Sequence, residues 1–173
     1  VAVAYASVAG LLHFLDVLEA RRRSRYTSQW LFGLDDYLTQ PGVLRTCLSI
    51  PNAEVRTARL QTQGCRFHPK LLIVSQNHTR SLACVGSSNL TLGGMRRNCE
   101  AFAAITATTA EESAQFSRTW GSIWQLGHAT TIEDIDAYEA DYSQRSPKWP
   151  DRDDIPQAEP SEEAQAGSES EGN

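Results

Sequence analysis

Residues 67 to 88 constrain the fold of this chain more than any other segment. The runs "FHPKLLIVS" and "SLACVGSS" have the character of strands, and the polar stretch "QNHTR" between them has the character of a turn. The segment therefore predicts a β-hairpin. The run "CEAFAAIT" predicts a further strand shortly afterwards, so the middle of the chain is expected to contribute several strands to a sheet.

Helical and extended segments alternate on both sides of this hairpin. Residues 9–22 carry leucines at helical spacing and end in the basic stretch "ARRRSR", after an alternating strand over residues 1–7. The remaining expectations are a short helix after Pro41, a strand in "AEVRTARL", a loop in "NLTLGGMRRN", and helices in "AEESAQFSRTWGSIWQLG" and "TIEDIDAYEADY". Together they predict an α/β fold, with a mixed sheet flanked by helices.

The composition divides the chain into a folded domain and a tail. The 173 residues are 40% apolar, which suits a single domain, expected over residues 1–145. Residues 146–173 are acidic and rich in Pro, Ser, Glu and Gly, and we expect disorder beyond about residue 150. No run of about 18 apolar residues occurs, so no membrane span is predicted.

The four cysteines indicate the compartment. No two of them form a Cys-x-x-Cys pair, and three stand beside apolar residues, which favours small core side chains in a reducing cytoplasm; they are Cys47, Cys65, Cys84 and Cys99. A zinc site is disfavoured, because only Cys65 and His68 have ordinary ligand spacing among the residues that could form one, Cys65, His68, His78, Cys84 and Cys99.

The net charge of −5 conceals a strong asymmetry. Residues 1–110 carry 12 Lys/Arg against 6 Asp/Glu, whereas residues 111–173 carry 4 against 15. The part that contains the hairpin is therefore basic, as expected of a protein that binds a polymer of phosphates, although such an excess can also serve only to solvate a surface.

Five polar residues in and after the hairpin form a candidate catalytic set. His68 and Lys70 are two apart on an expected strand, so they should share one face, where an imidazole can act as nucleophile or acid and an ammonium can neutralise a phosphate. Ser87 and Asn89 follow Gly86 in "GSSN" and offer a hydroxyl and an amide to phosphate oxygens. Glu100 could orient an imidazole. Each feature alone is common, but their order is difficult to ascribe to chance.

This set resembles the single His-Lys motif of the phospholipase D superfamily. The string "FHPKLLIV…VGSSNLTLGGMRRNCE" is most similar to the nuclease branch, which includes metal-independent restriction endonucleases and domains fused to helicases and defence proteins. One position departs from the pattern: Ser75 stands where the family motif has an Asp.

The resemblance implies a metal-independent phosphodiesterase, with no cofactor, that acts on DNA or alternatively RNA. His68 would form a phosphohistidine, Lys70, Ser87 and Asn89 would bind the phosphate oxygens, and Glu100 would orient an imidazole. Arg96 and Arg97, after the Gly-Gly pair, are candidates for contact with the nucleic-acid backbone, or are simply solvated.

Several alternatives remain open from the sequence. One is a lipid phosphodiesterase or phosphatidyl transferase, which is disfavoured because no amphipathic lipid-binding segment is visible. Another is a non-catalytic nucleic-acid-binding module, suggested by Ser75, and a third is a catalytic domain within a larger defence or helicase assembly. Because the two-histidine mechanism needs a second motif and no repeat supplies one, a homodimer with a shared site is predicted.

Overall fold

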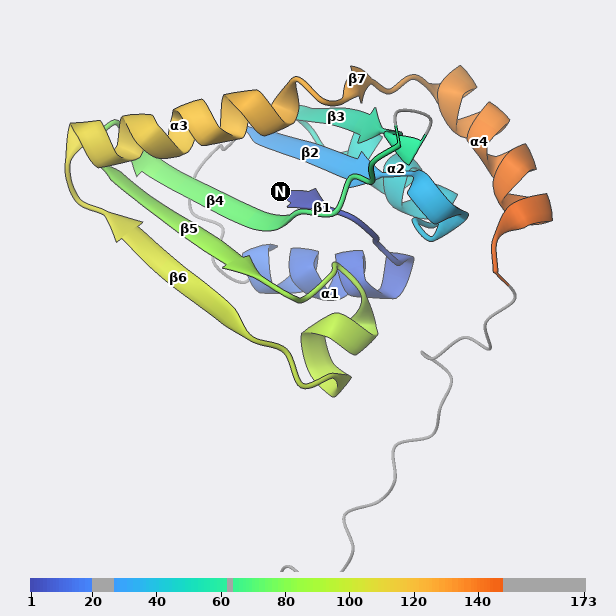
Figure 1. Cartoon of the computed structure of the whole chain (residues 1–173), viewed down its shortest axis with the longest axis horizontal. Helices are drawn as coiled ribbons and strands as arrows, with labels where there is room; N and C mark the ends of the chain where they lie inside the picture. The colour runs from blue at the N-terminus through green and yellow to red at the C-terminus, as the bar shows by residue number, and fades with distance from the viewer. Residues whose placement is uncertain (20–26, 62–63, 148–173) are drawn as a thin grey trace, which may run out of the picture.

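The computed structural model describes residues 1–19, 27–61 and 64–147 (Figure 1). The α/β fold predicted from the sequence is confirmed: seven strands form one mixed sheet with helices on both faces. In chain order the elements are β1 Ala2–Val3, α1 Val8–Glu19, β2 Ser28–Gly33, η1 Asp35–Tyr37, α2 Pro41–Leu48, β3 Ala53–Ala58, β4 Lys70–Asn77, β5 Arg80–Gly86, η3 Gly93–Arg97, β6 Phe102–Ala107, α3 Ala110–Trp124, β7 His128–Ala129 and α4 Ile132–Arg145.

The sheet has the strand order β6-β5-β4-β1-β2-β3-β7. Strands β1, β2 and β3 run parallel, with α1 and α2 as their crossovers, and every other pairing is antiparallel. The predicted hairpin is confirmed as β4 and β5, joined by a short polar turn. It lies beside β1, so segments from the start and the middle of the chain meet at the centre of the sheet.

Each face of the sheet packs against its own helices. On β2, Trp30 and Phe32 face a cluster with residues of α1, α2 and α4, whereas Leu31 between them faces a second cluster with Trp120 and Trp124 of α3. The strand is therefore buried on both faces, which explains its continuous apolar run "WLFG". The prediction that Trp120 and Trp124 belong to the core is confirmed by these contacts.

Both C-terminal helices begin with a capping box, and the sequence had indicated the one at α4. The Thr109 side chain accepts a hydrogen bond from the Glu112 amide while Glu112 bonds back to the Thr109 amide, and Thr131 and Asp134 repeat this arrangement at α4. Reciprocal bonds of this kind satisfy amides that a helix leaves without intrahelical partners. They locate the starts of α3 and α4 where the sequence predicted them.

Three local predictions were wrong. The expected strand over residues 1–7 is regular only at Ala2–Val3, although Ala6 still forms a bridge with Leu90. The expected loop over 89–98 contains a π-helical turn, η3, in which Gly94 packs against Asn89 too closely for any side chain. Of the cysteines, Cys47 is buried but Cys65 and Cys99 are exposed, so the latter two are not core residues.

Two predicted segments fall outside the described residues, wholly or in part: the basic stretch at 20–25 and nearly all of the tail at 146–173. Within the described part of the chain, no helix has the length and apolar character needed to cross a membrane.

Candidate active site

His68 and Lys70 are brought together at the start of β4. The Lys70 Nζ lies 3.0 Å from Nδ1 and 3.1 Å from Nε2 of His68. The two side chains lie together as predicted, but the predicted reason is not met. His68 precedes β4 rather than lying within it, so the alternation of side chains along a strand does not apply to this pair. The flanking side chains behave as expected, since Phe67 and Leu71 are both buried. The alternation of buried and accessible residues thus directs the histidine and the lysine outward.

A buried carboxylate fixes the segment that leads into His68. Asp35, at the end of β2, accepts hydrogen bonds from the backbone amides of Leu60 (3.1 Å), Gln61 (3.0 Å) and Phe67 (2.8 Å). Three charge-assisted bonds offset the cost of burying the carboxylate and tie the backbone of Leu60, Gln61 and Phe67 to the end of the β2 segment. The imidazole of His68, one residue after Phe67, is placed by this arrangement.

Tyr5 and Asp36 form a second contact around the imidazole. The Tyr5 ring meets His68 edge-on, with 5.7 Å between ring centroids, and its hydroxyl lies 3.3 Å from Oδ2 of Asp36. Arg66 Nη1 is 3.2 Å from the same carboxylate oxygen. Asp36 and its neighbour Tyr37 have φ angles of 63° and 54°, in the left-handed region that side-chain-bearing residues seldom adopt. Strained backbone of this kind is concentrated at functional sites.

The pKa values around the histidine favour a neutral imidazole. Partial burial lowers the pKa of His68, and the positive charges of Lys70 and Arg66 lower it further, against the opposing effect of Asp36. A neutral imidazole has a free lone pair and can act as a nucleophile at neutral pH. Burial also lowers the pKa of Lys70, and the negative charge of Glu100 opposes that shift.

Ser87, Glu100 and Asn98 form the opposite side of the site. The Ser87 hydroxyl donates to Oε2 of Glu100, and the Asn98 amide donates to Oε1 at 3.0 Å. These two bonds lower the pKa of Glu100, which is therefore ionised at neutral pH. Gly86 makes the arrangement possible, because a Cβ there would stand 2.5 Å from the Ala101 carbonyl oxygen. No hydrogen bond joins Glu100 to His68 in the described part of the chain, so the orienting role predicted for Glu100 is not seen within one subunit.

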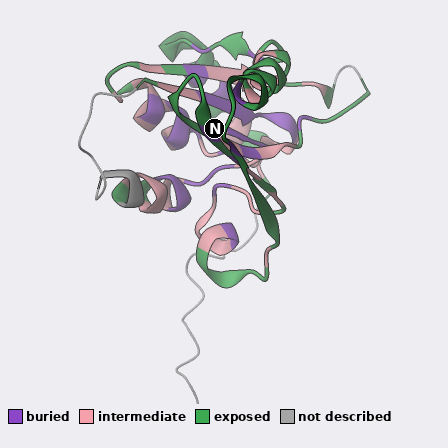
Figure 2. Cartoon of the chain, turned by 90° about the vertical axis from the view of Figure 1, so that its left-hand side faces the viewer, coloured by how far each residue is buried: buried purple, intermediate pink, exposed green. Residues whose placement is uncertain are grey.

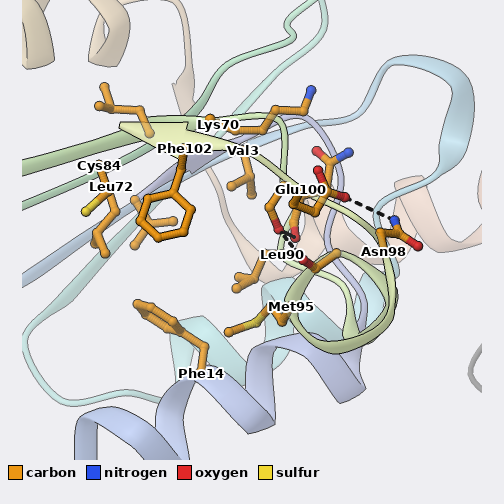
Figure 3. Close-up of a pocket in the computed structure, with 16 residues that line it drawn as sticks. Val3, Phe14, Lys70, Leu72, Cys84, Leu90, Met95, Asn98, Glu100 and Phe102 are labelled. Atoms are coloured by element: carbon orange, nitrogen blue, oxygen red, sulfur yellow. Dashed lines mark hydrogen bonds between the residues drawn. The ribbon is translucent and has the colours of Figure 1, made fainter. Parts of the chain in front are cut away.

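Asn89 is fixed by the first strand-like segment of the chain. Its Oδ1 accepts a hydrogen bond from the Tyr5 amide at 3.2 Å, which leaves Nδ2 as the atom that can donate to a phosphate. Asn89 lines a cavity together with Lys70 and Glu100, and Figure 3 shows the side chains of the latter two near one end of this cavity. The predicted set of His68, Lys70, Ser87, Asn89 and Glu100 therefore gathers around one end of β4 and β5, while Arg96 and Arg97 lie on the exposed part of η3.

Ser75, the position that departs from the family pattern, lies away from this site. It is five residues beyond Lys70 along β4, which corresponds to about 17 Å at the usual rise per residue, and on the opposite face. Its hydroxyl accepts from Ser81 on β5, which in turn accepts from Ser113 on α3. Ser75 thus contributes to the packing of α3 on the sheet and touches none of the five candidate residues.

Metal-ligating side chains do not cluster in the described ranges, where no three His, Cys, Asp or Glu residues are placed to hold one ion. The four histidines of the chain all fall within these ranges, and His13 is on α1, His78 in the β4–β5 turn and His128 on β7. None of those three is joined to His68 by a hydrogen bond or ring contact in the part of the chain that the structure describes.

Sequence reasoning missed Tyr5, Asp36 and Asn98. The pair "DD" after an apolar strand was a visible signal for Asp35 and Asp36, because charged residues at the end of a buried strand need a structural or chemical reason. Tyr5 carried no comparable signal, since it reaches the site only through contacts with residues 31 and 84 positions away in sequence.

The fold of the chain is that of the phospholipase D family. Nuc from Salmonella typhimurium, whose crystal structure is described as that of a phospholipase D family member, is similar with a TM-score of 0.52 at 14% identity, over 75% of this chain and 78% of Nuc. NucT from Helicobacter pylori gives a TM-score of 0.53 at 11% identity, over 75% of this chain and 79% of NucT. No family model and no curated protein matches the sequence. The predicted phospholipase D-like fold is therefore confirmed.

Proposed function

We propose that this chain is a metal-independent phosphodiesterase that cleaves DNA through a phosphohistidine on His68. The observation that carries the proposal is the contact of the Lys70 ammonium with the His68 imidazole at 3.0 Å, next to a cavity that Lys70 lines together with Asn89. A cationic group next to a neutral imidazole both attracts a phosphodiester and keeps the nucleophile unprotonated. The likeness to Nuc, a phospholipase D family member, supports the same chemistry.

The proposed reaction has two displacements at phosphorus. An imidazole nitrogen of His68 attacks, a P–N bond forms, and the P–O bond to the leaving oxygen breaks as that oxygen receives a proton. Water then attacks phosphorus, the P–N bond breaks, and the water proton passes to the group that protonated the leaving oxygen. Lys70, Ser87 and Asn89 stabilise the charge on the non-bridging oxygens in both steps.

The acid and base of this scheme must come from a second imidazole. His13, His78 and His128 lie on other elements than His68, which supports a second copy of the chain as the source. We therefore propose a homodimer in which two copies of His68 face one phosphorus across a two-fold axis. In the proposed dimer Glu100 of one copy would orient the imidazole of the other, which agrees with the lack of a hydrogen bond to its own His68 among the described residues.

Incubation with single-stranded and double-stranded DNA in excess EDTA tests the activity. Cleavage that persists in EDTA and is absent from a parallel preparation of His68→Ala supports the proposal. Complete loss on chelation with recovery on added metal contradicts the metal-independent mechanism. Absence of cleavage under every condition favours a non-catalytic nucleic-acid-binding module.

Subunit mixing tests the shared site. Wild type and His68→Ala are refolded together in equal amounts so that subunits pair at random. If one site needs both histidines, activity per total dimer falls to about a quarter of the pure wild-type value. A fall to about one half means that each chain carries a complete site.

A further inference from the structure

An apolar cleft of about 470 Å³ opens beside the candidate active site (Figure 3). Figure 3 shows Phe102 on one side of it, and Phe14 and Met95 on the other. Lys70, Asn98 and Glu100 stand at one end, so the cleft is continuous with the group of residues assigned above to the phosphate. Val3, Leu72 and Leu90 complete most of the apolar wall.

The cleft exists because one face of the sheet is incompletely covered. Along β4, Lys70, Leu72 and Val74 share a face, and the pairing of β4 with β5 and β6 brings Phe102 to that same face. Over β1 this face is packed against Phe14 and Leu11 of α1, but Val74 is 48% exposed and Phe102 is 74% exposed. A phenylalanine so accessible next to a candidate active site indicates a surface that binds something.

The shape and lining suit a nucleobase. A flat ring can lie against Phe102 with the flexible thioether of Met95 opposite, and stacking on an aromatic side chain is a common way to hold a base of single-stranded nucleic acid. The Asn98 amide and the Glu100 carboxylate offer a donor and acceptors to the edge of a base. An acyl chain would desolvate these two polar groups without replacing their hydrogen bonds, so it is the poorer occupant.

The positive charges near the cleft also favour a nucleotide as its ligand. Arg96 follows Met95 on η3 and is exposed, and Lys70 lines the cleft. One nucleotide could thus place its base between Phe102 and Met95 while its flanking phosphates meet these cations.

We propose that this cleft seats one nucleobase of single-stranded DNA next to the scissile phosphate, stacked on Phe102. The inference rests on the proposed function, because it takes the scissile phosphate to lie at Lys70 and Asn89. It adds to that function a requirement for an unpaired base beside the cleavage point. Duplex DNA must then open locally before cleavage, and strands without bases are poor ligands.

The test compares two strands of equal charge. The full chain carrying His68→Ala binds DNA without cutting it, and its affinity is measured by fluorescence anisotropy for an oligothymidylate and for an abasic strand with the same number of phosphates. We expect about tenfold tighter binding of the oligothymidylate, the size of one stacked base. Adding Phe102→Ala should reduce this preference to about twofold or less and leave the affinity for the abasic strand unchanged.

Ile105→Ala is the matched control. Ile105 is on the same strand, is 51% exposed, and faces the other side of the sheet, so its removal should leave the preference intact. A preference that survives Phe102→Ala, or that Ile105→Ala abolishes equally, overturns the proposal. The proposal is also overturned if Phe102→Ala has a different sedimentation coefficient from the parent protein but the same base preference. That result would mean that Phe102 contacts a second copy of the chain.

The failure of the cleft can be distinguished from the failure of the proposed function. If wild type cleaves DNA in EDTA but no base preference exists, only the cleft assignment is wrong. If the preference is present and depends on Phe102 but wild type never cleaves, the cleft is a binding site of a non-catalytic module. Absence of binding to both strands overturns the assignment of the cleft to a nucleobase. If a dihexanoyl phospholipid displaces the oligothymidylate, and Phe102→Ala prevents this displacement, the cleft binds acyl chains instead.

Discussion

The two halves of the sheet differ in what covers them. Strand β2, in the half formed by β1, β2 and β3, is buried over Trp30–Gly33, with helices on both faces. Strand β6, at the edge of the half formed by β4, β5 and β6, is exposed at every position except Ala107 (Figure 2). All five candidate catalytic residues are in or next to β4, β5 and β6. The comparison teaches that one half contains the strand most deeply buried in the core, while the other carries the candidate catalytic residues on a more accessible surface.

His68→Ala should produce the largest effect and should affect only the chemistry. We expect cleavage to fall by at least about 10³-fold, because no other group can form the covalent intermediate. The free energy of unfolding should change by about 1 kcal/mol or less, because His68 is exposed. DNA cleavage and urea unfolding of the same preparation measure both quantities. Residual cleavage near that of wild type would show that His68 is not the nucleophile.

Trp30→Ala, in the covered half of the sheet, should cause a large loss of stability, whereas His68→Ala should cause almost none. Trp30 is 2% exposed and packs against Phe14 and Phe32, so removal of its ring should cost about 3–5 kcal/mol in urea unfolding. Val74→Ala in the open half is the control, and its cost should stay below about 1 kcal/mol because Val74 is half exposed. Equal losses at the two positions would break the distinction between the halves.

Asp35→Ala tests the link between the halves. Three backbone amides lose their acceptor, and we expect a loss of about 2–3 kcal/mol in the free energy of unfolding together with a lower cleavage rate. Asp35→Asn retains one acceptor oxygen and should lose less of both. If the urea midpoint of unfolding of Asp35→Ala equals that of wild type, the carboxylate does not hold the segment before His68.

The smallest expected effect is a shift in the pKa of His68 in Lys70→Met, a variant that should also lose most of its cleavage because Lys70 is proposed to bind the phosphate oxygens. Burial and then the positive charge of Lys70 lower the pKa of His68, so removal of the ammonium should raise that pKa toward its ordinary value. The imidazole would then be protonated at higher pH, and the acid limb of any remaining activity would move up in pH. Proton NMR titration of the His68 ring protons measures the shift, and a pKa that falls or stays constant would contradict the contact seen here.

The sequence predicted the elements whose signals are local. The β4–β5 hairpin follows from two apolar runs and a polar turn, α3 from aromatic residues at helical spacing, and the start of α4 from Thr131 and the acidic residues after it. The grouping of His68 with Lys70 was also predicted, because side chains two residues apart on an expected strand share one face, although His68 in fact precedes β4.

Features that depend on tertiary contacts could not be predicted in the same way. Tyr5 reaches Asn89 and Asp36 only after β1 has inserted beside β4, and no local pattern records that event. The π-helical turn η3 forms where Gly94 packs on Asn89, whereas the Gly-Gly pair alone predicted a loop. The uncovered face beside Phe102 is likewise a property of which helix packs where.

The central claim, a phosphohistidine formed on His68, is tested most directly by the stereochemistry of cleavage. A DNA phosphorothioate of one configuration is hydrolysed by wild type in ¹⁸O-labelled water, and the configuration at phosphorus in the product is determined. Two successive in-line displacements each invert the centre, so our account predicts net retention. Net inversion would mean that water attacks the phosphodiester directly, and would contradict the proposed role of His68.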